Sequence, residues 1–161
     1  MKHPGVPGPI EGIQEVEPGI VIALQQLCAA YWMCADGSPE GIGRLFTENA
    51  VLTLGSLVLT GRAAIEGFFE ERATSMRTAE RTTRHAACSF LVTAVEESRA
   101  RVRSTVLVYS GTGSLPLPAT APSGIADFTD VCARDASGRW QFVSRIGRTV
   151  FVGPGAPSFA R

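Results

Sequence analysis

The stretch RTTRHAACSFLVTAV, from Arg81 to Val95, marks the point at which the pattern of this chain changes. Before it, apolar residues recur at the three- and four-residue spacing of helices. From Arg81 onwards, apolar and polar residues alternate, as they do in strands. Helices followed by a run of long strands are typical of an α+β domain. The stretch therefore predicts the first long strand of a sheet that the preceding helices cover.

The residues before this strand predict three helical segments and two short strands. A helix over residues 20–35 ends before Gly37, which stops it. Ser38 then has the side chain expected of the N-cap of a short second helix. The remaining elements are two short strands around residues 55–56 and a third helix over residues 62–76.

The residues after this point predict four long strands, separated by turns and by one loop rich in Gly and Pro. The predicted strands span residues 81–95, 99–110, 125–134 and 139–150. One curved sheet, mixed or antiparallel, would wrap around about three helices of the N-terminal half and form a cone. The open end of such a cone is a natural pocket for a small ligand.

The chain length and composition limit the possible classes of protein. The 161 residues fit one domain, which we expect over residues 19–152, between a flexible tail at 1–18 and a C-terminal tail at 153–161. Fifteen basic and fifteen acidic residues balance, which argues against nucleic-acid binding. The four cysteines lack metal-ligand spacing, and no secretory signal or membrane span is evident. We therefore expect a cytoplasmic protein with neither a membrane anchor nor a cofactor.

His85 is the one histidine of the expected domain, since His3 lies in the predicted tail. Strict alternation would place His85 on the same strand face as Ala87, Ser89, Leu91 and Thr93. The small residues next to the imidazole leave room, as in the wall of a cavity. A structural or surface histidine is the competing interpretation.

Asp36 lies at the end of the first predicted helix, where a carboxylate meets the negative end of the helix dipole. An aspartate in a turn before Gly37 is one explanation. The second explanation is a carboxylate held in place to meet a histidine, fix its tautomer and stabilise its protonated form.

Four segments in this order resemble the NTF2-like superfamily, in its SnoaL-like branch, over about residues 20–150. They are AAYWMCADGSPEGIGRLFTENAVLTL, GRAAIEGFF, RTTRH and GIADFTDVCARDASGRWQFVSRIGRTVF. The resemblance implies an NTF2-like cone in which Asp36 and His85 form a catalytic pair. It also implies that Arg145 matches an active-site arginine of the hexachlorocyclohexane dehydrochlorinase in this branch.

The chain departs from these relatives at the residues that select the substrate. Tyr31 stands where the dehydrochlorinase has a lysine, and Ala35 and Gly55 stand where scytalone dehydratase has tyrosines. We therefore expect a cofactor-independent lyase of the dehydratase type, or a proton-shift isomerase, acting on a small apolar or aromatic molecule. His85 would be the general base, and Tyr31 or Arg145 would stabilise developing charge.

Three further functions are compatible with the sequence. The cone could bind a small ligand without chemistry, or serve as a structural subunit like the β-subunits of ring-hydroxylating dioxygenases. Less favoured is an epoxide hydrolase, built on Asp127 and Asp130 with Arg101 or Arg103. We expect these charges to form cross-strand pairs on a solvated face instead.

The face of the sheet that the helices leave uncovered bears on whether the protein forms oligomers. We expect that face to carry Val102, Val106, Val108, Phe142 and Ile146. An apolar patch of this size is unusual on a monomer. The sequence therefore predicts a homo-oligomer, a dimer through the sheets or alternatively a trimer.

Overall fold

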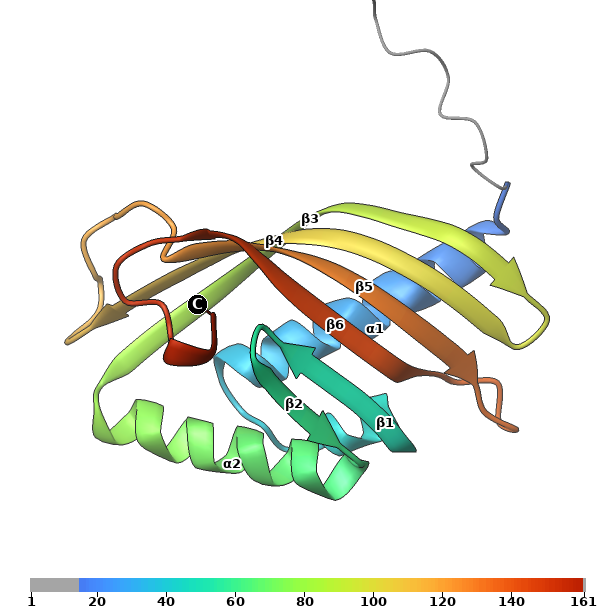
Figure 1. The fold of residues 1–161 in the computed structure, drawn as a ribbon, viewed down its shortest axis with the longest axis horizontal. Helices are drawn as coiled ribbons and strands as arrows, with labels where there is room; N and C mark the ends of the chain where they lie inside the picture. Colours follow the sequence, from blue (N-terminus) through green and yellow to red (C-terminus); the bar gives the residue numbers. More distant parts are fainter. Residues whose placement is uncertain (1–14, 161) are drawn as a thin grey trace, which may run out of the picture.

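The computed structural model describes residues 15–160, and its architecture is an α+β cone (Figure 1). One six-stranded sheet has the strand order β2-β1-β6-β5-β4-β3. The strands are β1 (Phe46–Leu54), β2 (Leu57–Thr60), β3 (Arg81–Glu96), β4 (Arg99–Thr112), β5 (Gly124–Arg134) and β6 (Trp140–Val152). Neighbouring strands are antiparallel, except that β1 and β6 run parallel. The predicted fold class is confirmed.

Two α-helices, α1 (Pro18–Asp36) and α2 (Arg62–Thr78), pack against this sheet. In Figure 1 the long strands arch over α1, while α2 lies across the opening beside β1 and β2. The Glu17 carboxylate caps α1 by accepting hydrogen bonds from the first backbone amides. α1 is long and apolar enough to cross a membrane, as core helices of soluble domains also are, and here its apolar face is buried in the core.

The short second helix is smaller than predicted. It is a single 3-10 turn, η1 (Ile42–Leu45), and Phe46 is already the first residue of β1. Gly41, with a φ of 82°, occupies the left-handed region just before the turn. Few residues then remain before Phe46 pairs with Phe142 of β6, so no longer helix fits.

Two bulges interrupt the alternation of β3. The pairing with β4 shifts between Cys88 and Leu91 and again between Val92 and Ala94, and Ser89 has a φ of 49°. An extra residue in a strand turns the following side chains to the opposite face. Val92 is therefore buried, whereas Leu91 pairs with Arg103 on the outer face. The prediction that Leu91 shares a face with His85 is wrong for this reason.

The expected apolar outer face is also wrong in most of its residues. Val102, Val106 and Phe142 have no exposed surface and belong to the core inside the cone. Alternation divides each strand into two faces without saying which of them is inward. Of the predicted patch, only Ile146 is a large exposed side chain, at 47%.

The C-terminal residues 153–160, expected as a tail, pack back against the open end of the cone (Figure 1). They include a 3-10 turn, η2 (Ser158–Ala160), and the Ser56 amide donates a hydrogen bond of 3.0 Å to the Phe159 carbonyl. Gly55 lies so close beneath this segment that an added Cβ would stand 1.9 Å from the Phe159 oxygen. The predicted N-terminal tail lies mostly outside the described residues, and Pro18 is already helical.

Gly55→Ala is expected to release the C-terminal segment from the cone. The new methyl group would collide with the backbone of Phe159, which cannot move without leaving its hydrogen bond to Ser56. Removal of the last residues by carboxypeptidase, followed by mass spectrometry, should become faster. Gly138→Ala is the matched control, because Gly138 also has a positive φ but has no atom within 4 Å of an added Cβ. Equal digestion of both variants would contradict the contact.

Candidate active site

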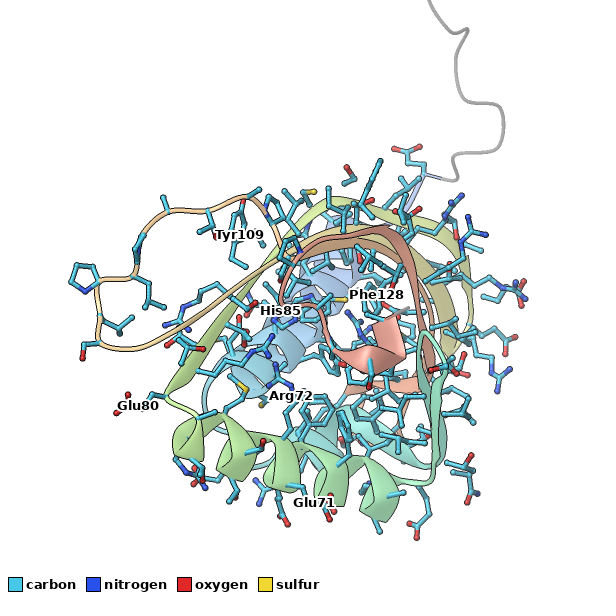
Figure 2. The ribbon with its side chains drawn as sticks, turned by 60° about the vertical axis from the view of Figure 1, so that its left-hand side comes forward. Glu71, Arg72, Glu80, His85, Tyr109 and Phe128 are labelled. Atoms are coloured by element: carbon cyan, nitrogen blue, oxygen red, sulfur yellow. The ribbon has the colours of Figure 1, made fainter. Side chains whose placement is uncertain are left out.

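The end of α1, the inner side of α2 and the concave face of the sheet enclose a cavity with a volume of about 380 Å³. This volume lies within the range of small-molecule sites. The wall is mainly apolar and aromatic, and the C-terminal segment contributes to it. Figure 2 shows His85, Phe128 and Arg72 disposed around this interior. Lining residues include Trp32, Phe68, Phe69, Val108, Phe128 and Phe159.

The structure brings Asp36 and His85 together, although they are 49 residues apart in the chain. The imidazole Nδ1 lies 2.6 Å from Asp36 Oδ1. The backbone amide of His85 donates to Asp36 Oδ2 at 2.7 Å, and the Thr83 hydroxyl donates to Oδ1 at 2.8 Å. One short piece of β3 thus supplies three hydrogen bonds to the carboxylate at the end of α1. His85 lines the apolar cavity, while Asp36 lies behind it and borders a second, more polar cavity.

These contacts determine which nitrogen of the imidazole carries the proton. Burial alone raises the pKa of Asp36, but the hydrogen bonds and charge of His85, with the bond from Thr83, outweigh it and lower the pKa below its ordinary value. An ionised carboxylate only accepts hydrogen bonds, so the Nδ1 of His85 must donate. In the neutral imidazole, Nε2 then keeps its lone pair and is the nitrogen left for a ligand. This is the arrangement of a general base with an orienting carboxylate.

Trp32 fixes the plane of the imidazole. Its indole stacks on the His85 ring with centroids 4.6 Å apart and an angle of 18° between the planes. Trp32 also contacts Phe128 edge to face, with centroids 5.1 Å apart. The helical pattern alone assigns Trp32 to the core. A residue one helical turn before Asp36 points in nearly the same direction, and this spacing was the available signal for its contact with His85.

The structure places the remaining two predicted site residues deeper. Tyr31 borders the cavity but is only 1% exposed, and burial raises the pKa of its hydroxyl to about 12. Arg145 has no exposed surface and does not reach the cavity wall within residues 15–160. Its guanidinium lies 4.2 Å from the centre of the Tyr31 ring and bonds Asp130 at 2.7 Å. Arg145 therefore supports the wall from behind.

The buried position of Asp130 corrects the expectation of a solvated charge pair. Asp130 is completely buried against Arg145, while Asp127 is exposed and accepts a hydrogen bond of 2.9 Å from the Thr105 hydroxyl. Arg101 and Arg103 are exposed on the outer face. These four residues do not gather into one site.

Arg72 and Thr83 are the site residues that sequence reasoning missed. Arg72 extends from α2 into the interior (Figure 2), lines the cavity, and donates to the Ala35 carbonyl and to the Thr83 hydroxyl. Thr83 connects this guanidinium to Asp36. The signal was present in the sequence, because Arg72 occupies the same helical stripe as Ile65, Phe68 and Phe69. A charge on an apolar stripe is typical of a side chain that has a specific partner.

The stability of the protein should depend on pH through Asp36. Its pKa is lower in the folded state, so its contribution to stability is present above the unfolded value of about 3.9 and is lost as the pH falls through the folded value. Asp36→Asn should lower the free energy of unfolding by about 1.5–3 kcal/mol at pH 7, because the hydrogen bonds from His85 and Thr83 would no longer have a charged acceptor. Urea denaturation of both proteins should show the difference closing below pH 4. A constant difference down to pH 3 would contradict an ionised Asp36.

Comparison with known protein families gave one match over most of the chain. A profile of the SnoaL-like domain matches residues 21–146. A comparison with curated protein sequences gave no match.

Comparison with solved structures gave many matches in the NTF2-like, or cystatin-like, fold. ActVI-ORFA from Streptomyces coelicolor superposes with a TM-score of 0.73 at 19% identity, covering 86% of this chain and 100% of its own. A provisionally named scytalone dehydratase from Novosphingobium aromaticivorans has a TM-score of 0.67 at 24% identity, covering 87% and 96%. A cystatin-like-fold protein of unknown function from Nostoc punctiforme has a TM-score of 0.68 at 16% identity, covering 88% and 98%. At these identities the likeness establishes the fold alone.

Proposed function

Because the chain belongs to the SnoaL-like domain family, we propose that it is a cofactor-independent enzyme that removes a proton from a carbon of a small apolar or aromatic molecule. Family membership and the fold support a role in binding or converting a small molecule. Elimination of the dehydratase type and proton-shift isomerisation are the two reactions that one such base can begin.

The observation that carries this proposal is the contact of 2.6 Å between Asp36 and the Nδ1 of His85 at the wall of an apolar cavity. Nε2 takes the proton, and the ionised Asp36 stabilises the imidazolium. In an elimination, the electron pair of the broken C–H bond forms a double bond and the leaving group departs, with the proton returned to it as water or acid. In an isomerisation, the imidazolium returns the proton to another carbon of the same molecule.

Tyr31 is the group that we assign to developing negative charge on the ligand. Its hydroxyl keeps its proton, since burial raises its pKa to about 12, and Tyr31 is one of the residues that border the cavity. A protonated phenol in a site with little water stabilises an oxyanion by donating a hydrogen bond. Arg145, over the Tyr31 ring, acts through this residue and not on the ligand.

Deuterium exchange tests the proposal even while the leaving group is unidentified. Hydroxylated and halogenated ring compounds are incubated with the protein in D₂O and followed by NMR. Enzyme-dependent loss of water or acid identifies a lyase, and deuterium incorporation with a moved double bond identifies an isomerase. His85→Gln, which keeps a polar side chain without a base, is the control. Compounds that bind beside His85 but neither exchange nor react would favour a binding module.

The geometry also bears on the structural-subunit and epoxide-hydrolase hypotheses. A structural subunit does not need an open interior. Here the side chains leave a cavity of about 380 Å³, and an oriented imidazole lines it. The epoxide-hydrolase set is not assembled, because Asp130 is buried against Arg145 while Asp127 is exposed.

We retain a homo-oligomer and a cytoplasmic location as part of the proposal. The support for an oligomer is narrower than the sequence predicted, and lies at the end of β6. Large apolar side chains exposed there are Ile146, Val150, Phe151 and Val152. A dimer is the favoured form and a trimer the alternative, and light scattering at micromolar concentration distinguishes them from a monomer.

A further inference from the structure

The cavity that contains His85 has an unbalanced set of charges. Arg72 and Arg81 are among its lining residues, whereas no aspartate or glutamate of the described chain lines it. A second cavity, with a volume of about 350 Å³, shares these two arginines and also borders Asp36 and Glu80. The two guanidinium groups thus stand where the apolar cavity gives way to the polar one.

Arg72 is held in place without a direct anionic partner. Within the part of the chain that the structure describes, its hydrogen bonds go to the Ala35 carbonyl and to the Thr83 hydroxyl, which lies 3.3 Å away. Within residues 15–160, none of the salt bridges includes Arg72. A guanidinium has five N–H donors, so further donors remain for a ligand.

The surroundings of Arg72 favour an added anion. Burial lowers the pKa of Arg72; Tyr31 and Asp36 oppose this effect, and the charge of Arg81 adds to it. An arginine in a protein nevertheless stays charged. A half-buried cation that is repelled by a second cation is therefore stabilised by a negative group bound in the cavity beside it.

Given the proposed function, we propose that the ligand of this cavity is an organic acid, with its ring in the apolar part and its carboxylate bound by Arg72. The planar fork of a guanidinium matches the two oxygens of a carboxylate. Arg81 adds long-range attraction while its own guanidinium is bonded to the Gly155 carbonyl. Arg72 is then the residue that selects an acid over a neutral ring of the same shape.

The probes that test this subsite are 2-naphthoic acid and 2-naphthamide, which share ring and shape but differ in charge. By isothermal titration calorimetry, we expect the wild-type protein to bind the acid about 10- to 100-fold more tightly than the amide. In Arg72→Gln the affinity for the acid should fall to about the level of the affinity for the amide, which loses much less because its bond to the guanidinium is to a neutral acceptor. Arg101→Gln, on the outer face, is the matched control and should keep the full preference.

Two further variants keep the test decisive if Arg72→Gln does not fold. Arg72→Lys should retain only part of the preference, since an ammonium group cannot bind both oxygens of a carboxylate in a fork. Arg81→Gln should reduce the preference and its dependence on salt. An unchanged preference in both variants would overturn the assignment.

The remaining outcomes separate this subsite from the proposed function. Equal affinities of the wild-type protein for acid and amide would overturn the acid subsite and leave the cavity as a ligand site. Binding of neither probe would also overturn the subsite. The deuterium-exchange screen would then test the proposed proton transfer independently of the subsite. A clear preference for the acid, with no exchange or reaction of any ring compound that binds, would support the subsite and favour a binding module over the proposed enzyme.

Discussion

His85→Gln is expected to lower kcat by about 10²–10⁴-fold, the usual contribution of general-base catalysis. The glutamine amide occupies similar space at the cavity wall but cannot take a proton from carbon. KM should change little, because the apolar and aromatic residues that enclose the ligand are untouched. The measurement is steady-state kinetics with any compound that reacts in the exchange screen.

Asp36→Asn should also act on kcat, because it removes the charge that orients the imidazole through the 2.6 Å contact. The two residues act as a unit, so the double variant should be little worse than the poorer single variant. Arg84→Gln is a suitable control, since Arg84 is exposed next to His85 in β3. Near-wild-type turnover of His85→Gln would show that the imidazole is part of the cavity wall and not its base.

Arg145→Met is expected to lower the free energy of unfolding by about 3–5 kcal/mol, the usual effect of breaking a buried ion pair. The Asp130 carboxylate would lose its 2.7 Å bond to the guanidinium and remain buried. Its second oxygen, Oδ1, has no hydrogen-bond partner in the described structure and cannot compensate. Urea denaturation at pH 7 measures the loss.

A double replacement separates the pair from the packing around it. Asp130→Leu with Arg145→Met removes both charges among the surrounding aromatic rings, and should recover most of the stability lost by Arg145→Met alone. Arg148→Met, on the exposed side of the same strand, should stay within about 0.5 kcal/mol of wild type. A double variant as unstable as the single one would show that guanidinium packing, not charge, is what matters.

The effect of Arg145→Met should also depend on pH. Burial raises the pKa of Asp130 to about 6, although Arg145 and Cys28 act to lower it. A carboxyl whose pKa is raised on folding favours the folded state when protonated, so this contribution is lost as the pH rises through that value. Removing the positive charge raises the pKa further. The destabilisation by Arg145→Met should therefore be larger at pH 8 than at pH 5. An equal loss of stability at both pH values would contradict a raised pKa of Asp130.

The extent of the long strands was predictable because the patterns that indicate their interiors and their ends are local in sequence. Alternation defined their interiors, and turns or a Gly- and Pro-rich loop defined their ends. The strand predicted over residues 99–110 is Arg99–Thr112 in the structure, and the one predicted over 125–134 is Gly124–Arg134. Such patterns arise from neighbouring residues and need no information from the rest of the chain.

Features set by distant contacts were not predictable in the same way. Alternation gave β4 two faces, but only the burial of Val102 and Val106 in the core shows that they face inward. The positive φ at the bulge falls on Ser89 and not on a glycine, so the sequence does not indicate the bulge. Continued alternation therefore placed Leu91 on the wrong face.

The site shows the same division between local and distant signals. The resemblance drew attention to Asp36 and His85, whose contact depends on where α1 ends and β3 begins. Arg145 and Arg72 both lie on apolar faces of their elements, and sequence alone could not tell which one reaches the cavity. Arg145 does not reach the cavity because Asp130, its partner across the β5–β6 pair, binds its guanidinium inside the core.

The distance along the chain between Asp36 and His85 has a consequence for how the protein folds. The parallel pairing of β1 with β6 joins Phe46 to Phe142, and β3 lies at the far edge of that sheet. Contacts between residues far apart in sequence raise the contact order and slow folding. Helices and the β4–β5 hairpin can form earlier, but the imidazole meets its carboxylate only when the edge strand docks on α1. In refolding experiments, ligand binding should therefore return later than circular dichroism, and it reports completion of the whole cone.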